Sequence, residues 1–216
     1  MTWDWGYVVE IMPDLLHGLV VTVQATLLGS VLALTLGLAL ALLRRSPVRV
    51  VRAVTGGFVE FVRSTPLLVQ LFALFYVAPS IGIQLSALTA GVVGLGLHYA
   101  TYTSEVYRAG IEGVPVGQWE AATALSLPRR RVWTGVILPQ AVPRVLPALG
   151  NYVVAMFKET PLLSAITVLE LLQVAKGLGS ESFRYLEPFT LVGVLFLLVS
   201  LPAALLTRRL EARLAR

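Results

Sequence analysis

Cysteine is absent from this chain of 216 residues, so neither a disulfide nor a thiol nucleophile is available to it. Histidine occurs only twice, and the sequence contains no glycine-rich phosphate loop. These absences leave no candidate metal site and no nucleotide pocket. We therefore predict that the chain is not an enzyme and that it binds no metal or cofactor of its own.

Charged residues are also scarce, at 13% of the chain against 56% hydrophobic residues. Soluble domains carry roughly twice that charged fraction. The composition and length predict one all-α integral membrane domain over 1–216, without a separate soluble enzyme domain. The net charge of +5 could indicate nucleic acid, but the positions of the charges fit membrane topology better, so no nucleic-acid partner is expected.

Five stretches of the sequence are apolar and long enough to cross a lipid bilayer. They lie at about 15–43, 57–78, 85–107, 143–168 and 188–207. Residues from Gly56 to Val62 favour a short helix leading into the second stretch. The fourth stretch is interrupted by Pro161, which removes a backbone hydrogen bond one turn earlier.

The basic residues are distributed unevenly among the connecting segments. If the N-terminus lies outside the cell, the cytoplasmic segments are 44–63, 108–144 and 208–216, which hold five, five and four of the 17 basic residues. Cytoplasmic loops of membrane proteins are enriched in lysine and arginine. We therefore predict five spans with the N-terminus outside and the C-terminus in the cytoplasm.

A polar segment, residues 115–139, lies between the third and fourth apolar stretches. Its part from Trp119 to Leu125 favours a short helix, because three alanines and a leucine have high helix propensity. Ser126 and Leu127 interrupt this helix, and Pro128 suits the first turn of a second short helix. Two short helices joined by a kink would form a compact knob that another protein could grip.

The spacing within this segment resembles the signature loop of the membrane-spanning subunits of bacterial ATP-binding-cassette importers. Glu120-Ala121-Ala122 is followed after three residues by a small residue, Ser126, and after nine more by Val136-Ile137-Leu138-Pro139. The family usually has glycine where this chain has Ser126. Because glycine reaches left-handed backbone angles cheaply and serine does not, this difference concerns the geometry of the kink.

The resemblance implies a MetI-like fold of type I importer permeases, with the knob as a coupling helix that docks on a cytoplasmic ATPase. The coupling residues that it implies are Trp119, Glu120, Ala121, Ala122 and Ser126. It also implies two ATPase subunits that bind ATP and Mg²⁺, a second permease subunit, identical or not, and an extracytoplasmic solute-binding protein. The expected location is the bacterial cytoplasmic (inner) membrane, in contact with lipid.

The resemblance covers nearly the whole chain, from about Gly18 to Leu210. Leu138–Ala141 and Leu146–Asn151 resemble permeases for polar amino acids. The stretches Lys158–Leu171 and Phe183–Pro188 are similar to permeases for ectoine and hydroxyectoine. These likenesses imply a polar or zwitterionic amino-acid-like solute, with ectoine or hydroxyectoine as the narrower expectation.

Polar side chains at membrane depth are the candidates for the solute path. Lys158, Glu159 and Thr160 come just before Pro161, in the middle of the fourth stretch, and broken helices are where transporters commonly bind substrate. A Lys–Glu site could meet both charges of a zwitterion. The alternative is a Lys–Glu pair that only braces helix packing.

Two further groups of candidates have competing interpretations. His98, Tyr102 and Glu105 share one helix face and could line the path, but Glu105 is also spaced to form an ion pair with Arg108. His98 could equally bond a neighbouring helix. Gln70 could face the second permease across the pore, although a structural role is the more common one.

Two other classes of function are compatible with the composition. A secondary carrier or channel for small polar solutes would need no ATPase and would leave the Glu-Ala-Ala segment unexplained. A noncatalytic membrane scaffold would carry no solute at all.

The arginine distribution generates a topology prediction. Single cysteines introduced at Ser46 and Ser126 should be shielded from an impermeant thiol reagent in intact cells, whereas one at Ser180 should react. Labelling at Ser126 from outside would contradict the predicted orientation.

Overall fold

The structure is a computed structural model that describes residues 3–214. Residues 1, 2, 215 and 216 lie outside it, and with them Arg216, one of the arginines in the topology prediction. Within residues 3–214 the regular elements are all helical and no strand occurs. The predicted all-α fold class is therefore confirmed.

Nine α-helices occur in the described part of the chain. They are α1 (Trp5–Leu43), α2 (Arg49–Arg63), α3 (Leu67–Phe72), α4 (Ala87–Glu112), α5 (Val116–Ala124), α6 (Arg129–Val132), α7 (Leu138–Glu159), α8 (Leu171–Ser182) and α9 (Leu186–Leu214). Short helices of other types extend three of them. They are the π-helices Ala73–Val77 and Trp133–Ile137 and the 3₁₀ helices Ala78–Ile81 and Thr160–Ile166.

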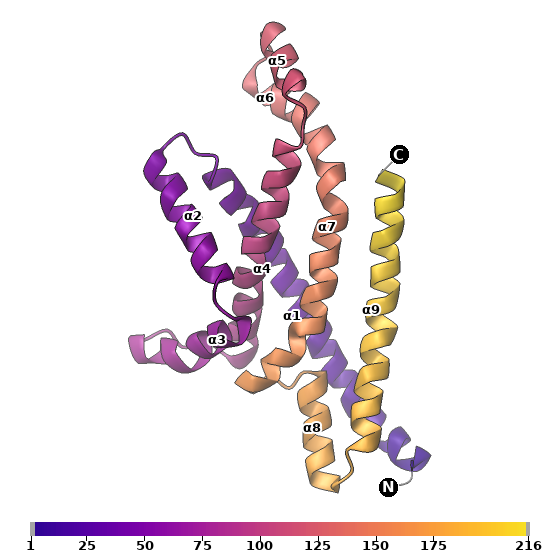
Figure 1. The fold of residues 1–216 in the computed structure, drawn as a ribbon. Helices are drawn as coiled ribbons and strands as arrows, with labels where there is room; N and C mark the ends of the chain where they lie inside the picture. Colours follow the sequence, from indigo (N-terminus) through magenta and orange to yellow (C-terminus); the bar gives the residue numbers. More distant parts are fainter. Residues whose placement is uncertain (1–2, 215–216) are drawn as a thin grey trace.

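The helices form an elongated bundle around α1, α4 and α7 (Figure 1). α2 and α3 lie on one side of α4, and α9 lies beyond α7 on the other. The α1–α2 connection, the α5–α6 region and the C-terminal end of α9 are all found toward one end of the bundle, and the N-terminus and α8 toward the other (Figure 1). Parts of all three arginine-rich segments therefore lie toward the same end of the bundle, which is compatible with the predicted orientation.

By length and composition, α1 and α9 are the helices of the described part that could each cross a membrane alone. Two bent pairs could each form one more span, which raises the number from two to four. α4 covers most of the predicted third stretch, but it is not apolar enough to be recognised as a span by composition. Its glycine, threonine, tyrosine and histidine residues lower its mean hydropathy. The count of five spans stays a prediction.

The second predicted stretch, 57–78, is not one continuous helix. The helix Arg49–Arg63 and the segment Leu67–Ile81 meet at an angle of 103°. Pro66 lies at this corner, with extended backbone angles, and it disfavours helical angles for the residue before it. The short helix expected from Gly56 is therefore the second half of a longer helix, α2, that begins at Arg49.

Small residues allow α1 and α4 to pack closely. A Cβ atom on Gly37 would collide with Thr103 Oγ1 and would lie 2.9 Å from the carbonyl oxygen of Ala100. Thr103 Oγ1 also donates a hydrogen bond of 2.8 Å across the interface to the carbonyl oxygen of Ala33. Such contacts hold membrane helices together where lipid removes the hydrophobic drive for association.

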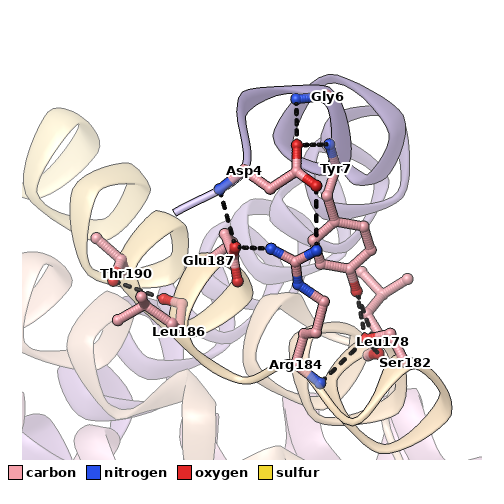
Figure 2. Close-up of polar contacts among 9 residues, drawn as sticks. All are labelled: Asp4, Gly6, Tyr7, Leu178, Ser182, Arg184, Leu186, Glu187 and Thr190. Carbon is pink, nitrogen blue, oxygen red and sulfur yellow. Dashed lines mark hydrogen bonds and ion pairs between the residues drawn. The ribbon is translucent and has the colours of Figure 1, made fainter. Parts of the chain in front are cut away.

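At the end of the bundle opposite α5, ion pairs and hydrogen bonds around Arg184 hold the helices together (Figure 2). Asp4 caps α1 by accepting from the backbone N–H groups of Gly6 (2.8 Å) and Tyr7 (3.3 Å). Arg184, in the α8–α9 turn, pairs with Asp4 at 3.1 Å and with Glu187 on α9 at 2.5 Å. The N–H of Tyr7, the guanidinium of Arg184 and the N–H of Gly6 hold the pKa of Asp4 below its usual range. The start of α1 is thereby tied to α9.

Candidate functional site

The α5–α6 segment forms a compact knob at the arginine-rich end of the bundle (Figure 1). We define the knob as residues 116–137. A small apolar core attaches it to the end of α4 and the start of α7. Its buried members are Ile111, Val114, Ile137 and Ala141. Both helices that the sequence predicts around the kink are present, as α5 and α6, but α6 continues through the π-helix Trp133–Ile137 into α7 and does not stop at Pro139.

The kink at Ser126 has the left-handed geometry that glycine usually provides. Ser126 has φ +50°, and its backbone N–H donates to the carbonyl oxygen of Thr123 at 2.9 Å. The N–H of Leu127 donates to the carbonyl oxygen of Ala122 at 3.1 Å. These two bonds form a Schellman motif at the end of α5. The serine therefore changes the energy of the kink and not its form.

The five predicted coupling residues occupy different environments. Glu120, Ala121 and Ser126 are exposed. Ala122 is only 2% exposed, so its side chain packs inside the knob and does not present itself to a partner. Trp119 is half-buried, with its ring 5.5 Å from that of Trp133 in an edge-to-face arrangement.

A hollow of about 470 Å³ lies between α5 and α6. It is lined by Trp119, Thr123, Ser126, Leu127, Arg129, Val132 and Trp133. Its walls combine aromatic and aliphatic surface with hydroxyl groups, so it could accept a side chain of a docked protein.

Arg45, at the end of α1, extends to the knob. Its guanidinium carbon lies 6.0 Å from the ring centre of Trp119 and 5.8 Å from that of Trp133. Exposed cation–π contacts of this kind contribute roughly 0.5–1 kcal/mol. No sequence pattern indicates this contact, because Arg45 and the two tryptophans are far apart in the chain and only the fold brings them together.

A second group of polar side chains lies within the bundle, on α4 and its neighbours. Gln70 Nε2 donates to the carbonyl oxygens of Val62 (2.7 Å) and Thr65 (3.0 Å), which closes the sharp corner between α2 and α3. Its Oε1 lies 3.2 Å from His98 Nδ1. Because an amide oxygen can only accept, Nδ1 is the donor in this contact, and Nε2 takes no part in it. These bonds give Gln70 a structural role at the corner between α2 and α3.

Three tyrosines continue this group from His98 toward α7. The His98 and Tyr102 rings are 5.1 Å apart, and Tyr102 and Tyr99 lie 5.8 Å and 6.0 Å from Tyr152 on α7. The guanidinium carbon of Arg63 lies 5.2 Å from the Tyr102 ring centre. We call the set Gln70, His98, Tyr99, Tyr102, Tyr152 and Glu159 the polar cluster.

Glu159 belongs to the polar cluster, whereas Lys158 does not. Glu159 is close enough to His98 and Tyr99 for its charge to act on both, and its Oε2 is buried without a hydrogen-bond partner among the described residues. Lys158 is exposed. The suggested Lys–Glu pair is not formed, because α7 stays regular through Glu159 and adjacent residues of a helix point about 100° apart.

Thr160 is fully buried, and its hydroxyl donates to the carbonyl oxygen of Phe157 at 2.7 Å. The helix changes to 3₁₀ geometry from Thr160 onward, where Pro161 was expected to disturb it. Thr160 thus satisfies its own hydrogen bond within the turn, and its hydroxyl proton is not offered to the polar cluster.

Glu105 forms ion pairs with arginines, so its carboxylate is not free to line a path. It accepts from Arg44 at the end of α1 and from Arg108 at 2.7 Å and 2.9 Å, and Arg63 lies 3.8 Å away. The local pair with Arg108 predicted as the alternative is present. Glu105 therefore joins α4 to the ends of α1 and α2 between the polar cluster and the knob.

A family model described as the binding-protein-dependent transport system inner membrane component matches residues 12–216. The chain belongs to this family. Its members are inner-membrane components of transport systems that depend on a binding protein, which agrees with the resemblance carried by the Glu-Ala-Ala segment.

Individual relatives match this family member along nearly its whole length. A probable amino-acid ABC transporter permease protein of Sinorhizobium fredii is 45% identical, covering 100% of this chain and 95% of the relative. The L-cystine transport system permease protein of Bacillus subtilis is 35% identical, covering 94% of this chain and 89% of the relative.

Solved structures confirm the permease fold. A chain of a crystal structure described as an amino acid ABC transporter with histidines has a TM-score of 0.92 and 34% identity, with 99% of this chain and 100% of that chain covered. A chain of the inward-facing MetNI methionine ABC transporter has a TM-score of 0.79 at 19% identity, covering 96% of this chain and 99% of that chain, and supports the fold alone.

The strained kink gives a testable prediction. Ser126→Gly should stabilise the knob by about 1 kcal/mol, because a side chain in the left-handed region costs roughly that much. Ser126→Val should destabilise it, since a branched side chain is worse there. Hydrogen exchange of the backbone amides at positions 126 and 127 measures the stability of the kink directly. Slower exchange in Ser126→Val than in Ser126→Gly would contradict the strained geometry.

Proposed function

We propose that this chain is the permease subunit of an ATP-driven amino-acid importer and that its knob is the surface on which an ATPase docks. The observation that carries the proposal is the exposed pair Glu120 and Ala121 on a short helix that ends in a left-handed kink. The matches to amino-acid ABC transporter permeases support it. ATP and Mg²⁺ would bind to the ATPase chains, and this chain would catalyse no reaction.

The proposed orientation places the N-terminus outside and the C-terminus in the cytoplasm. The α1–α2 connection, the knob and the end of α9 lie toward one end of the bundle and carry most of the arginines (Figure 1). Cytoplasmic loops of membrane proteins are enriched in lysine and arginine, so we expect this end of the bundle to face the cytoplasm. There a soluble ATPase could reach Glu120.

The proposed assembly has two copies of the ATPase, a second permease subunit and an extracytoplasmic solute-binding protein. ATP-driven closure of the ATPases would move the two knobs, and the permeases would open alternately to either side. The solute would enter from the binding protein and leave to the cytoplasm.

The proposed solute is a polar, zwitterionic amino-acid-like molecule. Relatives are named for amino acids in general and for L-cystine in particular. Ectoine and hydroxyectoine are narrower candidates that rest on the resemblance of Lys158–Leu171 and Phe183–Pro188 alone. All of these solutes carry a cationic and an anionic group, so the site must offer a partner for each.

The polar cluster is the proposed solute path. Glu159 offers a buried carboxylate oxygen without a partner in the described part of the chain, which suits a cationic group of the solute. His98 keeps one ring nitrogen outside its bond to Gln70, and Tyr102 is half-buried beside it. Glu105 is occupied by arginines and Thr160 by the backbone, so both support the path without lining it.

A secondary carrier or channel is the remaining alternative. It would use the same polar cluster, but it would give no role to the exposed surface of α5 or to the hollow beside it. Neither a carrier nor a scaffold requires a kink that costs energy to hold. The importer function is therefore the one that the knob favours.

Docking is tested by changing the exposed surface of α5. Glu120→Lys and Ala121→Trp should leave the permease in the membrane but weaken co-purification of the ATPase. Losing one partner of a buried interfacial charge pair costs about 2–5 kcal/mol, and added volume is poorly tolerated in a fitted groove. Binding-protein-stimulated ATP hydrolysis should fall in parallel.

The control for docking is Glu181→Lys, which reverses an exposed charge at the opposite end of the bundle. It should not change ATPase association. Ala122→Trp is unsuitable as a docking variant, because Ala122 is buried and the change would disrupt the knob itself. Normal stimulated hydrolysis by a well-expressed Glu120→Lys variant would remove the basis of the proposal.

The solute path is tested by Glu159→Gln. A hydrogen bond to a charged group contributes about 1.5–3 kcal/mol, so uptake at low solute concentration should fall about tenfold or more. Because Lys158 is exposed and unpaired with Glu159, membrane abundance should stay normal. ATPase co-purification and Glu181→Gln serve as controls. Unchanged uptake with unchanged abundance would show that Glu159 does not contact the solute.

A further inference from the structure

Two consecutive arginines at the end of α1 contact different parts of the molecule. Arg44 donates to Glu105 on α4. Arg45 places its guanidinium over Trp119 and Trp133 of the knob. One turn of backbone therefore carries both contacts, and the N–H of Arg44 bonds this turn to the carbonyl oxygen of Leu40.

The Arg44 side of this turn leads to the polar cluster. Glu105 is also held by Arg108 and lies 3.8 Å from Arg63. Arg63 in turn covers Tyr102, with 5.2 Å between its guanidinium carbon and the ring centre. A continuous series of contacts therefore joins the knob to the tyrosines of the proposed solute path.

Among the described residues, Arg45 forms no ion pair that would compete with its contacts to the two tryptophans. Among residues 3–214, no carboxylate lies within salt-bridge distance of Arg45, although it is exposed and charged. Its aromatic contacts are with two rings from separate segments, Trp119 on α5 and Trp133 at the start of the π-helix. The planar guanidinium suits stacking on aromatic faces, which an ammonium group does less well.

We propose that the Arg44–Arg45 turn is the mechanical link between the knob and the solute path, with Arg45 as a positioning residue for coupling. When a docked ATPase displaces the knob, the contact of Arg45 with the two tryptophans pulls the end of α1. Arg44 and Glu105 then transmit the movement to α4 and to Arg63. This inference rests on the proposed importer function and adds the residues that couple hydrolysis to transport.

The experiment compares Arg45→Gln with wild type in proteoliposomes that contain the permease, its ATPase and its binding protein. A tritiated pool of the standard L-amino acids is the probe. Arg45→Gln should keep ATPase co-purification and basal hydrolysis, but uptake per ATP hydrolysed should fall at least about threefold, because knob movement no longer reaches the end of α1 and, through Arg44 and Glu105, Arg63 beside the polar cluster. Arg45→Lys should give an intermediate ratio.

The matched control is Arg49→Gln, an exposed arginine at the start of α2 that forms no ion pair within residues 3–214. It should keep the wild-type ratio. A second variant, Arg44→Lys, should lower the ratio as well, and combining it with Arg45→Gln should add little further loss, since both act on one link.

Three outcomes for uptake per ATP hydrolysed would overturn the link. They are a wild-type ratio in Arg45→Gln, equal losses in Arg45→Gln and Arg49→Gln, and fully additive losses in the double variant. A fall in ATPase co-purification by Arg45→Gln would also overturn it, because Arg45 would then only hold the knob in shape. If wild type itself shows no ATP-dependent uptake, the importer function fails first, which distinguishes that failure from failure of the link.

Discussion

The close packing of α1 against α4 is the constraint on which both candidate sites depend. Gly37 leaves room for the carbonyl of Ala100, and Thr103 donates across the interface to Ala33. α4 carries the central residues of the polar cluster, and α1 ends in Arg44 and Arg45, which contact Glu105 and the knob. If the two helices separated, the tyrosines would lose their packing and the arginines would lose their partners together.

The same packing explains which helices hydropathy could and could not identify. α1 and α9 are apolar enough to be recognised as spans by composition, and α9 exposes many of its large side chains. α4 lies between other helices, so its polar residues are covered by protein and its sequence need not be strongly apolar. The helix itself could be predicted from the sequence, but its central position could not.

Spacing along the chain predicted the knob and not the orientation of its side chains. The Glu-Ala-Ala pattern and Pro128 were sufficient to place two short helices and a kink. Which alanine is buried depends on how α5 packs on α4 and α7, and the structure buries Ala122 and exposes Ala121. The cation–π contacts of Arg45 with two tryptophans depend on three segments meeting in space, so no local pattern could indicate them.

The separation of Lys158 from Glu159 has an energetic consequence for transport. A buried acceptor without a hydrogen bond costs about 1–3 kcal/mol, and Glu159 Oε2 is such an atom within the described residues. Had Lys158 reached it, that cost would vanish and the site would have no preference for a cationic group. Because Lys158 is exposed and does not reach it, Oε2 stays open to a donor that a solute or a changed conformation supplies. Under the proposed mechanism, solute binding and the conformation that admits it therefore stabilise each other.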